Sequence, residues 1–287
     1  MSVAHKVRVP ASSEKEDEVR HAVREHYKQL ALKQTPCCGS DRSTMCGCGS
    51  IYSESDVSSL PSESVSVSAG CGNPTAIAGL KEGMTVVDLG SGGGIDAFLS
   101  SKKVGPKGRV YGIDATPEMI HRARKTAREN GFDNVEFRLG EIEHMPLPDG
   151  CADVVISNCV INLSPAKQQV FDEAFRVLRP GGKLAVSDII LLKELPESLR
   201  NDMAAWSSCV SGAVLESEYI GAIEKAGFTK VEVEDRAVYT HEQLSAYIQD
   251  SDQGVEATAV RSFSGKKDRM DLSGTVASYR ISAVKPG

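Results

Sequence analysis

The sequence is poor in aromatic residues and in histidine. Aromatic side chains make up 5% of its 287 residues, with a single tryptophan, and there are six histidines. Sites that work by general base catalysis or that stack a ligand on an aromatic wall rely on these side chains. Chemistry of that kind therefore has few candidate residues here.

The chain also has no excess of positive charge, since 33 Lys and Arg stand against 39 Asp and Glu, a formal net charge of −6. Proteins whose main partner is a nucleic acid are typically basic, so we expect no nucleic-acid partner. No apolar run approaches the roughly 20 residues that a membrane helix needs, so we expect no membrane partner. The start of the sequence has no apolar stretch typical of a secretory signal. We therefore expect a cytoplasmic protein, and a monomer.

Cysteine is the exception to this ordinary composition, with eight residues. Thiols stay reduced in the cytoplasm, so metal binding, catalysis or simple burial is expected rather than a disulfide framework. Four cysteines lie close together and four are scattered singly. The clustered ones are Cys37, Cys38, Cys46 and Cys48, and the single ones are Cys71, Cys151, Cys159 and Cys209.

Composition divides the chain into three parts. Residues 1–75 predict a helix over 16–32, followed by a loop rich in cysteine and serine. Residues 76–190 alternate short apolar strands with helical patterns, which predicts an α/β domain with an open, mostly parallel sheet. Residues 191–287 are more polar, and we expect this extension to close the sheet and to contribute to the substrate site.

The strongest local signal is a strand at 85–89 followed by the glycine-rich turn Gly90–Gly94 and a helix from 95 to 102. Glycines let a backbone approach a ligand closely, and a helix N-terminus binds polar groups. The next strand, 109–113, ends at Asp114, at the spacing typical of a carboxylate that binds ribose hydroxyls. The alternatives are a plain turn for the glycines and a solvated carboxylate for Asp114.

Further strands and helices follow in alternation, and the last strand is expected to be an antiparallel edge strand. The expected strands are 135–139, 153–157, 183–187, 231–233 and 278–284; the expected helices are 119–129, 166–177 and 219–225, and a turn is expected at 179–182.

Three segments, VVDLGSGGGIDAFLS, VYGIDATPEMI and LRPGGKLAVSD, resemble motifs of the class I S-adenosylmethionine-dependent methyltransferases. The resemblance implies a Rossmann-like, mostly parallel seven-stranded sheet with its last strand antiparallel, and S-adenosylmethionine as methyl donor. It places the glycines at the methionine part of the cofactor, Asp114 at the ribose and residues 140–142 at the adenine. The implied cofactor-binding residues are Asp88, Gly90, Gly92, Asp114, Ala115, Met119, Gly140, Glu141, Ile142 and Asn158.

Three of the single cysteines are candidates for the acceptor site. Cys159 directly follows a predicted strand, at the end where ligands of such folds bind. Cys71 lies between glycines just before the α/β part, and Cys209 lies in the C-terminal extension. Their spacing matches no zinc motif, whereas three thiolates without a fourth suit a soft, three-coordinate centre. The alternative for each is a small buried apolar residue.

The segments GCGNP, SNCVINL, SSCVSGAV and GEIEHMPLPDG are similar to those of the arsenite S-adenosylmethionine methyltransferases. This resemblance implies that Cys159 and Cys209 hold trivalent arsenic and that Cys71 completes the site. Arsenite would be methylated to mono- and dimethylated arsenicals as a detoxification. A disulfide would form, and an external reductant of the thioredoxin or glutathione type would restore the thiols. The alternatives are a C- or O-methyltransferase of the quinone-biosynthesis type and a non-catalytic arsenic or redox sensor.

The four clustered cysteines have several possible roles. In the family that the chain resembles, a cysteine upstream of the glycine-flanked one can pair with it, so we expect Cys37 or Cys38 to be the redox partner of Cys71. A zinc site at all four cysteines and a flexible thiol segment that delivers arsenite remain open, although the usual two-residue spacing of zinc ligands is missing.

Overall fold

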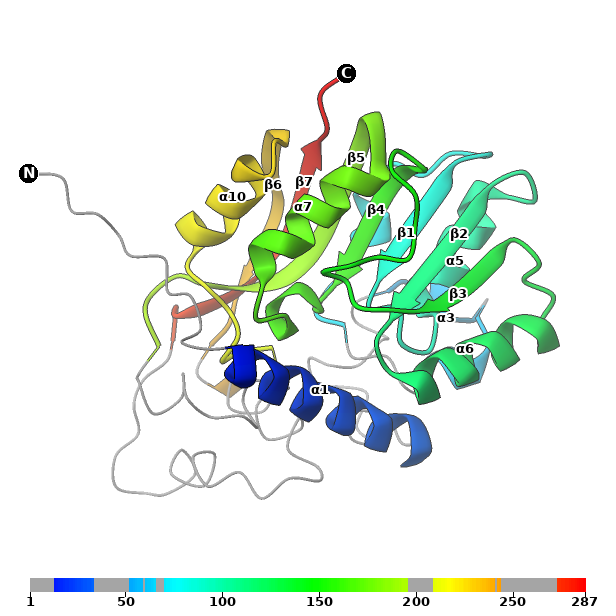
Figure 1. Cartoon of the computed structure of the whole chain (residues 1–287), viewed down its shortest axis with the longest axis horizontal. Helices are drawn as coiled ribbons and strands as arrows, with labels where there is room; N and C mark the ends of the chain where they lie inside the picture. The colour runs from blue at the N-terminus through cyan, green and yellow to red at the C-terminus, as the bar shows by residue number, and fades with distance from the viewer. Residues whose placement is uncertain are drawn as a thin grey trace, which may run out of the picture.

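The computed structural model describes residues 13–33, 52–58, 60–65, 70–195, 209–240, 242–243 and 273–287. A seven-stranded sheet in the order β3-β2-β1-β4-β5-β7-β6 forms its centre, with helices on both faces (Figure 1). The strands are β1 (Thr85–Leu89), β2 (Arg109–Asp114), β3 (Val135–Leu139), β4 (Ala152–Asn158), β5 (Leu178–Leu191), β6 (Thr229–Val238) and β7 (Val276–Val284). The helices are α1 (Ser13–Lys33), α3 (Glu54–Ser58), α4 (Ser62–Val65), α5 (Ile95–Val104), α6 (Pro117–Glu129), α7 (Lys167–Val177) and α10 (Glu216–Lys225), with short 3₁₀ turns η1 (Pro74–Ala76) and η2 (Ile161–Leu163).

The first five strands are parallel, and β7 is antiparallel to both of its neighbours, β5 and β6. The expected class I methyltransferase fold is thereby confirmed. The strand order reverses between β1 and β4, which lie side by side. In open α/β sheets such a switch point leaves a crevice at the carboxyl ends of the two strands, where ligands bind.

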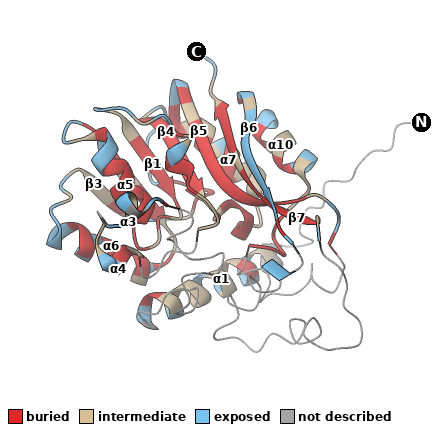
Figure 2. Ribbon diagram, turned by 180° about the vertical axis from the view of Figure 1, so that it is seen from behind, coloured by how far each residue is buried: buried red, intermediate tan, exposed pale blue. Residues whose placement is uncertain are grey.

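Two apolar layers hold the helices to the sheet, and Figure 2 shows the buried strands between them. On one face α5 and α6 contribute side chains such as Phe98 and Ile120. On the other face α7 and α10 contribute Phe171 and Tyr219, whose rings meet edge to face. Burial of apolar surface on both faces explains why the strands read as continuous apolar runs rather than alternating ones.

The observed limits of helices and strands agree with the predicted ones where a nearby residue, such as a proline, marks the boundary. Helix α6 begins at Pro117, a residue suited to the first helical turn, and ends at Glu129, with Asn130 as its C-cap. Strand β5 is longer than expected and includes the predicted turn at 179–182, which is an irregularity in the pairing with β4. The predicted loop over 36–75 includes the short helices α3 and α4.

Strands from both sides of the expected division at residue 190 belong to one sheet, because β7 pairs with β5 and β6 pairs with β7. No helix within the described residues is long and apolar enough to cross a bilayer.

Candidate active site

An open cavity lies at the switch point between β1 and β4, with a volume of about 1080 Å³ that includes solvent space at its entrance. The glycine-rich turn that follows β1 forms one wall, and the segment that follows β4 forms another. Of the ten residues predicted to bind the cofactor, all but Gly140 line this cavity. Those nine are Asp88, Gly90, Gly92, Asp114, Ala115, Met119, Glu141, Ile142 and Asn158.

The glycine-rich turn has the backbone conformation that only glycine adopts freely. Gly90 has φ +61° and Gly92 has φ +49°, and a Cβ on Gly92 would point into open space. The amide of Gly92 donates to the Asp114 carboxylate at 2.9 Å, which ties the turn to the end of β2. A carboxylate oxygen can accept more than one hydrogen bond, so Asp114 keeps capacity for ligand hydroxyls.

Two polar atoms of this wall fit a polar ligand. Asp88 Oδ2 and Ser91 Oγ are buried and have no hydrogen-bond partner within the part of the chain that the structure describes. Buried polar atoms without partners are rare in folded proteins. Burial raises the pKa of Asp88 well above its ordinary value, and the charges of Asp96 and Asp114 raise it further.

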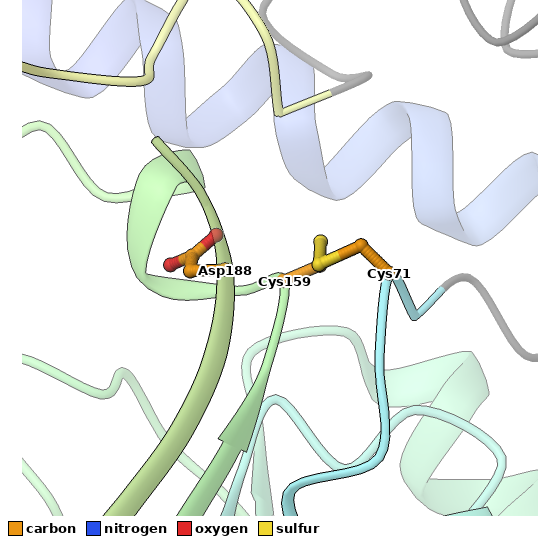
Figure 3. A group of neighbouring side chains, drawn as sticks. All are labelled: Cys71, Cys159 and Asp188. Carbon is orange, nitrogen blue, oxygen red and sulfur yellow. A yellow bond between two sulfur atoms is a disulfide. The ribbon is translucent and has the colours of Figure 1, made fainter. Parts of the chain in front are cut away.

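The three predicted thiol residues meet beside this cavity. Cys71 and Cys159 form a disulfide with a Cα–Cα distance of 5.8 Å, although they are 88 residues apart in the sequence (Figure 3). Cys209 Sγ donates to the carbonyl oxygen of Cys159 at 2.7 Å. Cys159 lines the cavity, so the thiol cluster and the cavity share a wall.

Comparison with known proteins bears on both parts of the site. A family profile described as a methyltransferase domain matches residues 80–236. This chain belongs to the methyltransferase family. The arsenite methyltransferase of Halobacterium salinarum is 42% identical over 252 residues, 83% of this chain and 64% of the relative. The human arsenite methyltransferase is 42% identical over 51% of this chain and 42% of the relative.

A solved structure supports the same relationship. An arsenic(III) S-adenosylmethionine methyltransferase of Chlamydomonas reinhardtii matches with a TM-score of 0.63 and 33% identity, over 81% of this chain and 72% of the algal one. The resemblance of this methyltransferase to the arsenite enzymes is thereby confirmed, and its expected methyl donor, S-adenosylmethionine, is supported. The chain spans less than two thirds of the length of the two curated relatives above.

The backbone of this methyltransferase is strained at two of its thiol residues. Cys159 has φ +57° and Cys209 has φ +65°, in the left-handed region that non-glycine residues rarely adopt. Such conformations cost about 1–3 kcal/mol each and cluster at functional sites. Cysteine itself has no preference for this region, so residue type alone does not predict it at either position.

The glycines on both sides of Cys71 are explained by close packing. A Cβ on Gly70 would overlap the side chain of Asn158, and a Cβ on Gly72 would overlap Ser187. The segment therefore runs directly against Asn158 at the end of β4 and against Ser187 within β5. This is the structural reason for the GCG pattern noted in the sequence.

Helix α1 lies below the strands in the view of Figure 1, and its residues Val23 and Tyr27 line the cavity. Arg20 and Arg24 line the cavity, and both form ion pairs with Glu141, at 3.8 and 3.7 Å. Arg20 also pairs with the buried Glu143 at 3.6 Å. The sequence predicted the helix but not that it lies over this cavity, because nothing in its own periodicity shows which surface it covers.

A buried polar group lies next to the thiols. An Asp188 oxygen lies within 4.8 Å of the sulfur atoms of Cys71 and Cys159. The carboxylate accepts hydrogen bonds from Asn162 Nδ2 at 2.8 Å and from the Tyr219 hydroxyl at 2.9 Å. Burial raises its pKa to about 6.

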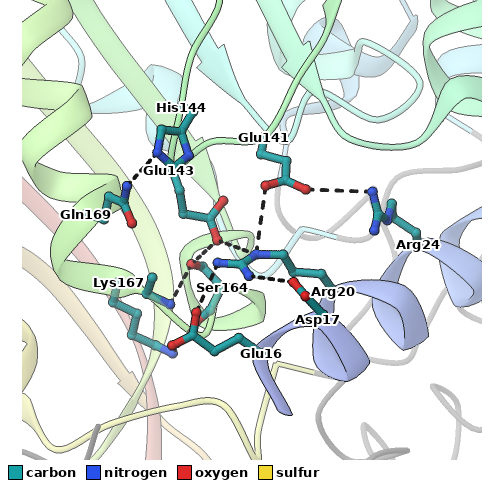
Figure 4. A network of polar contacts seen from close by, with 11 residues as sticks. Glu16, Asp17, Arg20, Arg24, Glu141, Glu143, His144, Ser164, Lys167 and Gln169 are labelled. Carbon is teal, nitrogen blue, oxygen red and sulfur yellow. Dashed lines mark hydrogen bonds and ion pairs between the residues drawn. The ribbon is translucent and has the colours of Figure 1, made fainter. Parts of the chain in front are cut away.

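Lys167 belongs to the same polar region. It donates to the carbonyls of Asn162 and Ser164, at 3.2 and 2.9 Å (Figure 4). Burial lowers its pKa to about 8, while Asp188, Cys209 and Glu143 act in the opposite direction. Sequence reasoning missed both Asp188 and Lys167, since a single buried charge leaves no motif.

The remaining predicted site residues are the clustered cysteines. Cys37 and Cys38, and with them Cys46 and Cys48, fall outside the described residues, so their pairing with Cys71 or binding of zinc stays a prediction. In this structure the partner of Cys71 is Cys159.

Proposed function

We propose that this methyltransferase transfers methyl groups from S-adenosylmethionine to trivalent arsenic bound by Cys71, Cys159 and Cys209. The single observation that carries the proposal is that three cysteines from three distant segments contact one another, through a disulfide and a hydrogen bond, at Cys159 in the cavity wall. The names of the relatives agree with it. The whole protein's activity, its substrates and its partners are part of this proposal.

Substrate binding follows from thiol chemistry. With the disulfide reduced, three thiols condense with arsenous acid, forming three As–S bonds and releasing three waters. Thiolates are soft ligands that suit a soft trivalent centre. Cys159 and Cys209 are each 2% exposed, so arsenic bound there is shielded from water.

The transfer step needs no general base. S-adenosylmethionine would supply a methyl group on a sulfonium, an electrophile. Trivalent arsenic bound to three sulfurs keeps a lone pair, which forms the new As–C bond while the electron pair of the broken S–CH₃ bond stays on the donor sulfur. No proton is removed, which fits the scarcity of histidine near the site. The protein's part is to position the two reactants and to exclude water.

The bound arsenic is formally oxidised from the trivalent to the pentavalent state by this step. Two thiolates return two electrons to it and become a disulfide. Cys71 and Cys159 are suited to this role because they are within bonding distance. An external thiol reductant, of the thioredoxin or glutathione type, would then reduce the disulfide by exchange.

The cofactor would be held by the nine predicted residues that line the cavity. The orphaned Asp88 Oδ2 and Ser91 Oγ, the open face of Gly92 and the carboxylate of Asp114 fit its polar groups. We also propose a monomer in the cytoplasm. The quinone-type alternative is less supported by the comparisons, and no observation at the site favours it.

The proposal is tested by arsenic speciation. Purified protein is incubated with arsenite, S-adenosylmethionine and a thiol reductant, and the products are separated chromatographically. We expect mono- or dimethylated arsenic from the wild type and from Cys151→Ser, whose thiol is half-buried outside the cluster. Cys159→Ser should yield at least 100-fold less. No methylated arsenic from a wild type that binds the cofactor would refute the proposal.

Cys71 can be distinguished from the other two ligands by the substrate. A monomethylated trivalent arsenical has one position already filled by carbon and needs two thiolates. We therefore expect Cys71→Ser to lose arsenite methylation but to keep activity on this substrate, with the added thiol reductant returning the two electrons that Cys71 and Cys159 otherwise supply, whereas Cys209→Ser loses both. Equal loss on both substrates for Cys71→Ser would show that Cys71 is needed for more than the third bond.

A further inference from the structure

Tyr52 is a buried residue that does not line the cavity, yet its hydroxyl joins two residues that do. Its side chain is 2% exposed and packs with Ile95 and Leu99 of α5. The hydroxyl lies 2.9 Å from both carboxylate oxygens of Asp96 and 2.9 Å from Nδ2 of Asn158. Because an ionised carboxylate only accepts and an amide nitrogen only donates, Tyr52 donates to Asp96 and accepts from Asn158.

Asn158 in turn holds the segment that carries Cys71. Its Oδ1 accepts from the backbone amides of Cys71 and Gly72, at 3.1 and 3.3 Å, and its Nδ2 donates to the Gly72 carbonyl at 2.6 Å. The opposite orientation of the amide would bring its NH₂ group against two N–H donors. In the observed orientation Nδ2 faces Tyr52 and Asp96, which both accept from it, and Oδ1 faces the two N–H donors. Tyr52 and Asp96 therefore favour the orientation that binds the Cys71 segment.

This segment has little freedom of its own. Gly70 and Gly72 lie so close to Asn158 and Ser187 that neither position has room for a Cβ. Asn158 is followed directly by Cys159, so one side chain fixes Cys71 against the residue next to it in the sequence. In a buried network each hydrogen bond polarises the next, which strengthens the hydrogen bonds from the two backbone N–H groups to the Asn158 side chain.

We propose that Tyr52 is a positioning residue that acts through Asp96 and Asn158 to hold Cys71 opposite Cys159. Its relevance to arsenic rests on the proposed function above, but the geometry concerns the thiol pair itself. The assignment also connects the two halves of the site, because Asp96 and Asn158 line the cofactor cavity while Cys71 and Cys159 form the thiol pair.

The test measures the thiol pair without arsenic. Wild type and Tyr52→Phe are equilibrated with mixtures of reduced and oxidised glutathione, in which two cysteine thiols and one oxidised glutathione give one protein disulfide and two reduced glutathiones. Free thiols are trapped by alkylation, and the Cys71–Cys159 disulfide is quantified by peptide mass spectrometry. We expect Tyr52→Phe to lower the equilibrium constant for this disulfide about tenfold, which raises its reduction potential by about 30 mV.

Tyr279→Phe is the matched control. Tyr279 is 1% exposed and its hydroxyl donates to the Glu216 carboxylate at 2.8 Å, so this variant also removes a buried tyrosine–carboxylate hydrogen bond. The Glu216 end of this bond is only half-buried. The disulfide equilibrium of Tyr279→Phe should equal that of the wild type. Asp96→Asn, which removes the charge that orders the network, should shift the equilibrium in the same direction as Tyr52→Phe and serves if that variant does not fold.

The outcomes separate this inference from the proposed function. A wild-type potential in folded Tyr52→Phe, or an equal shift in Tyr279→Phe, would overturn the positioning role. Absence of arsenic methylation by the wild type would refute the proposed function and leave the glutathione result to judge Tyr52. If methylation occurs, Tyr52→Phe should raise KM for arsenite about tenfold and change the Kd for S-adenosylmethionine less than twofold; a shift in the cofactor's Kd with no change in KM would overturn the role.

Discussion

The backbone at Gly72, beside Cys71, has no room for a side chain. A Cβ at this position would lie 1.8 Å from Ser187 Oγ and 2.9 Å from Ser187 Cβ, so rotation of the serine hydroxyl alone cannot make room. We expect Gly72→Ala to destabilise the protein by about 1–3 kcal/mol, as overpacking does in other cores. The free energy of unfolding in urea measures the effect.

Gly221 offers the control for this substitution. It lies in α10, and a Cβ there would meet nothing within 4 Å. Gly221→Ala should therefore stabilise the protein by about 0.5–1 kcal/mol, because alanine loses less conformational freedom in a helix than glycine. Equal effects of the two substitutions would contradict the packing explanation for the glycines beside Cys71.

The ion pairs of helix α1 lead to a prediction about cofactor binding, because they lie beside the cavity proposed to hold the cofactor. Arg20 is the stronger contact, since its partner Glu143 is buried with a side chain 5% exposed. Removing one partner of a buried pair leaves an uncompensated charge, whereas an exposed pair contributes only about 0–1 kcal/mol. We expect Arg20→Gln to raise the Kd for S-adenosylmethionine about tenfold and Arg24→Gln about twofold, measured by calorimetric titration.

Lys125→Gln is the control for α1, because Lys125 and its partner Glu129 are exposed on α6. It should leave cofactor binding unchanged. The effect of Arg24→Gln should also shrink at high salt, since exposed charges are screened. If the Kd of Arg20→Gln for S-adenosylmethionine equals the wild-type value, the ion pairs of α1 do not contribute to cofactor binding.

For the whole molecule, the sheet was predictable from the sequence and the site only in part. Strands β1 and β3 were predicted with their observed limits and the other strands with shifted ends, because apolar runs and turn residues are local signals. The cysteines could be gathered only by resemblance. Tyr52 and Asp188 could not be found, because each acts through contacts with residues more than 25 positions away.

The difference between local signals and distant contacts also explains why the backbone conformation of two cysteines and the position of α1 were not predicted. Left-handed backbone at Cys159 and Cys209 is imposed by the packing around them and not by their own preferences. Periodicity predicts which face of α1 is apolar, but the choice of the cavity as its neighbour depends on charges at Glu141 and Glu143, over 100 residues away. Tertiary contacts of this kind leave no trace in a local window.

The buried acids give the whole molecule an unusual dependence of stability on pH. Burial raises the pKa of Asp96 to about 6, against an ordinary value of 3.8, and hydrogen bonds from Asn158 and Tyr52 only partly offset this. A carboxyl whose pKa is higher in the folded state binds its proton more tightly there. Its contribution to stability is therefore fully present below about pH 4 and is lost as the pH rises through about 6.

Between pH 7.5 and pH 5, Asp96 should thus stabilise the folded state by about 1 kcal/mol as the pH falls. Glu173 acts in the opposite sense, because its hydrogen bond with Arg176 lowers its pKa, but that loss comes only near and below its ordinary value of 4.5. Urea unfolding of the cofactor-free protein at the two pH values measures the slope. Asp96→Asn, which cannot titrate, should reduce the slope by about 1 kcal/mol over this range, and an unchanged slope would mean that Asp96 is ionised at pH 5.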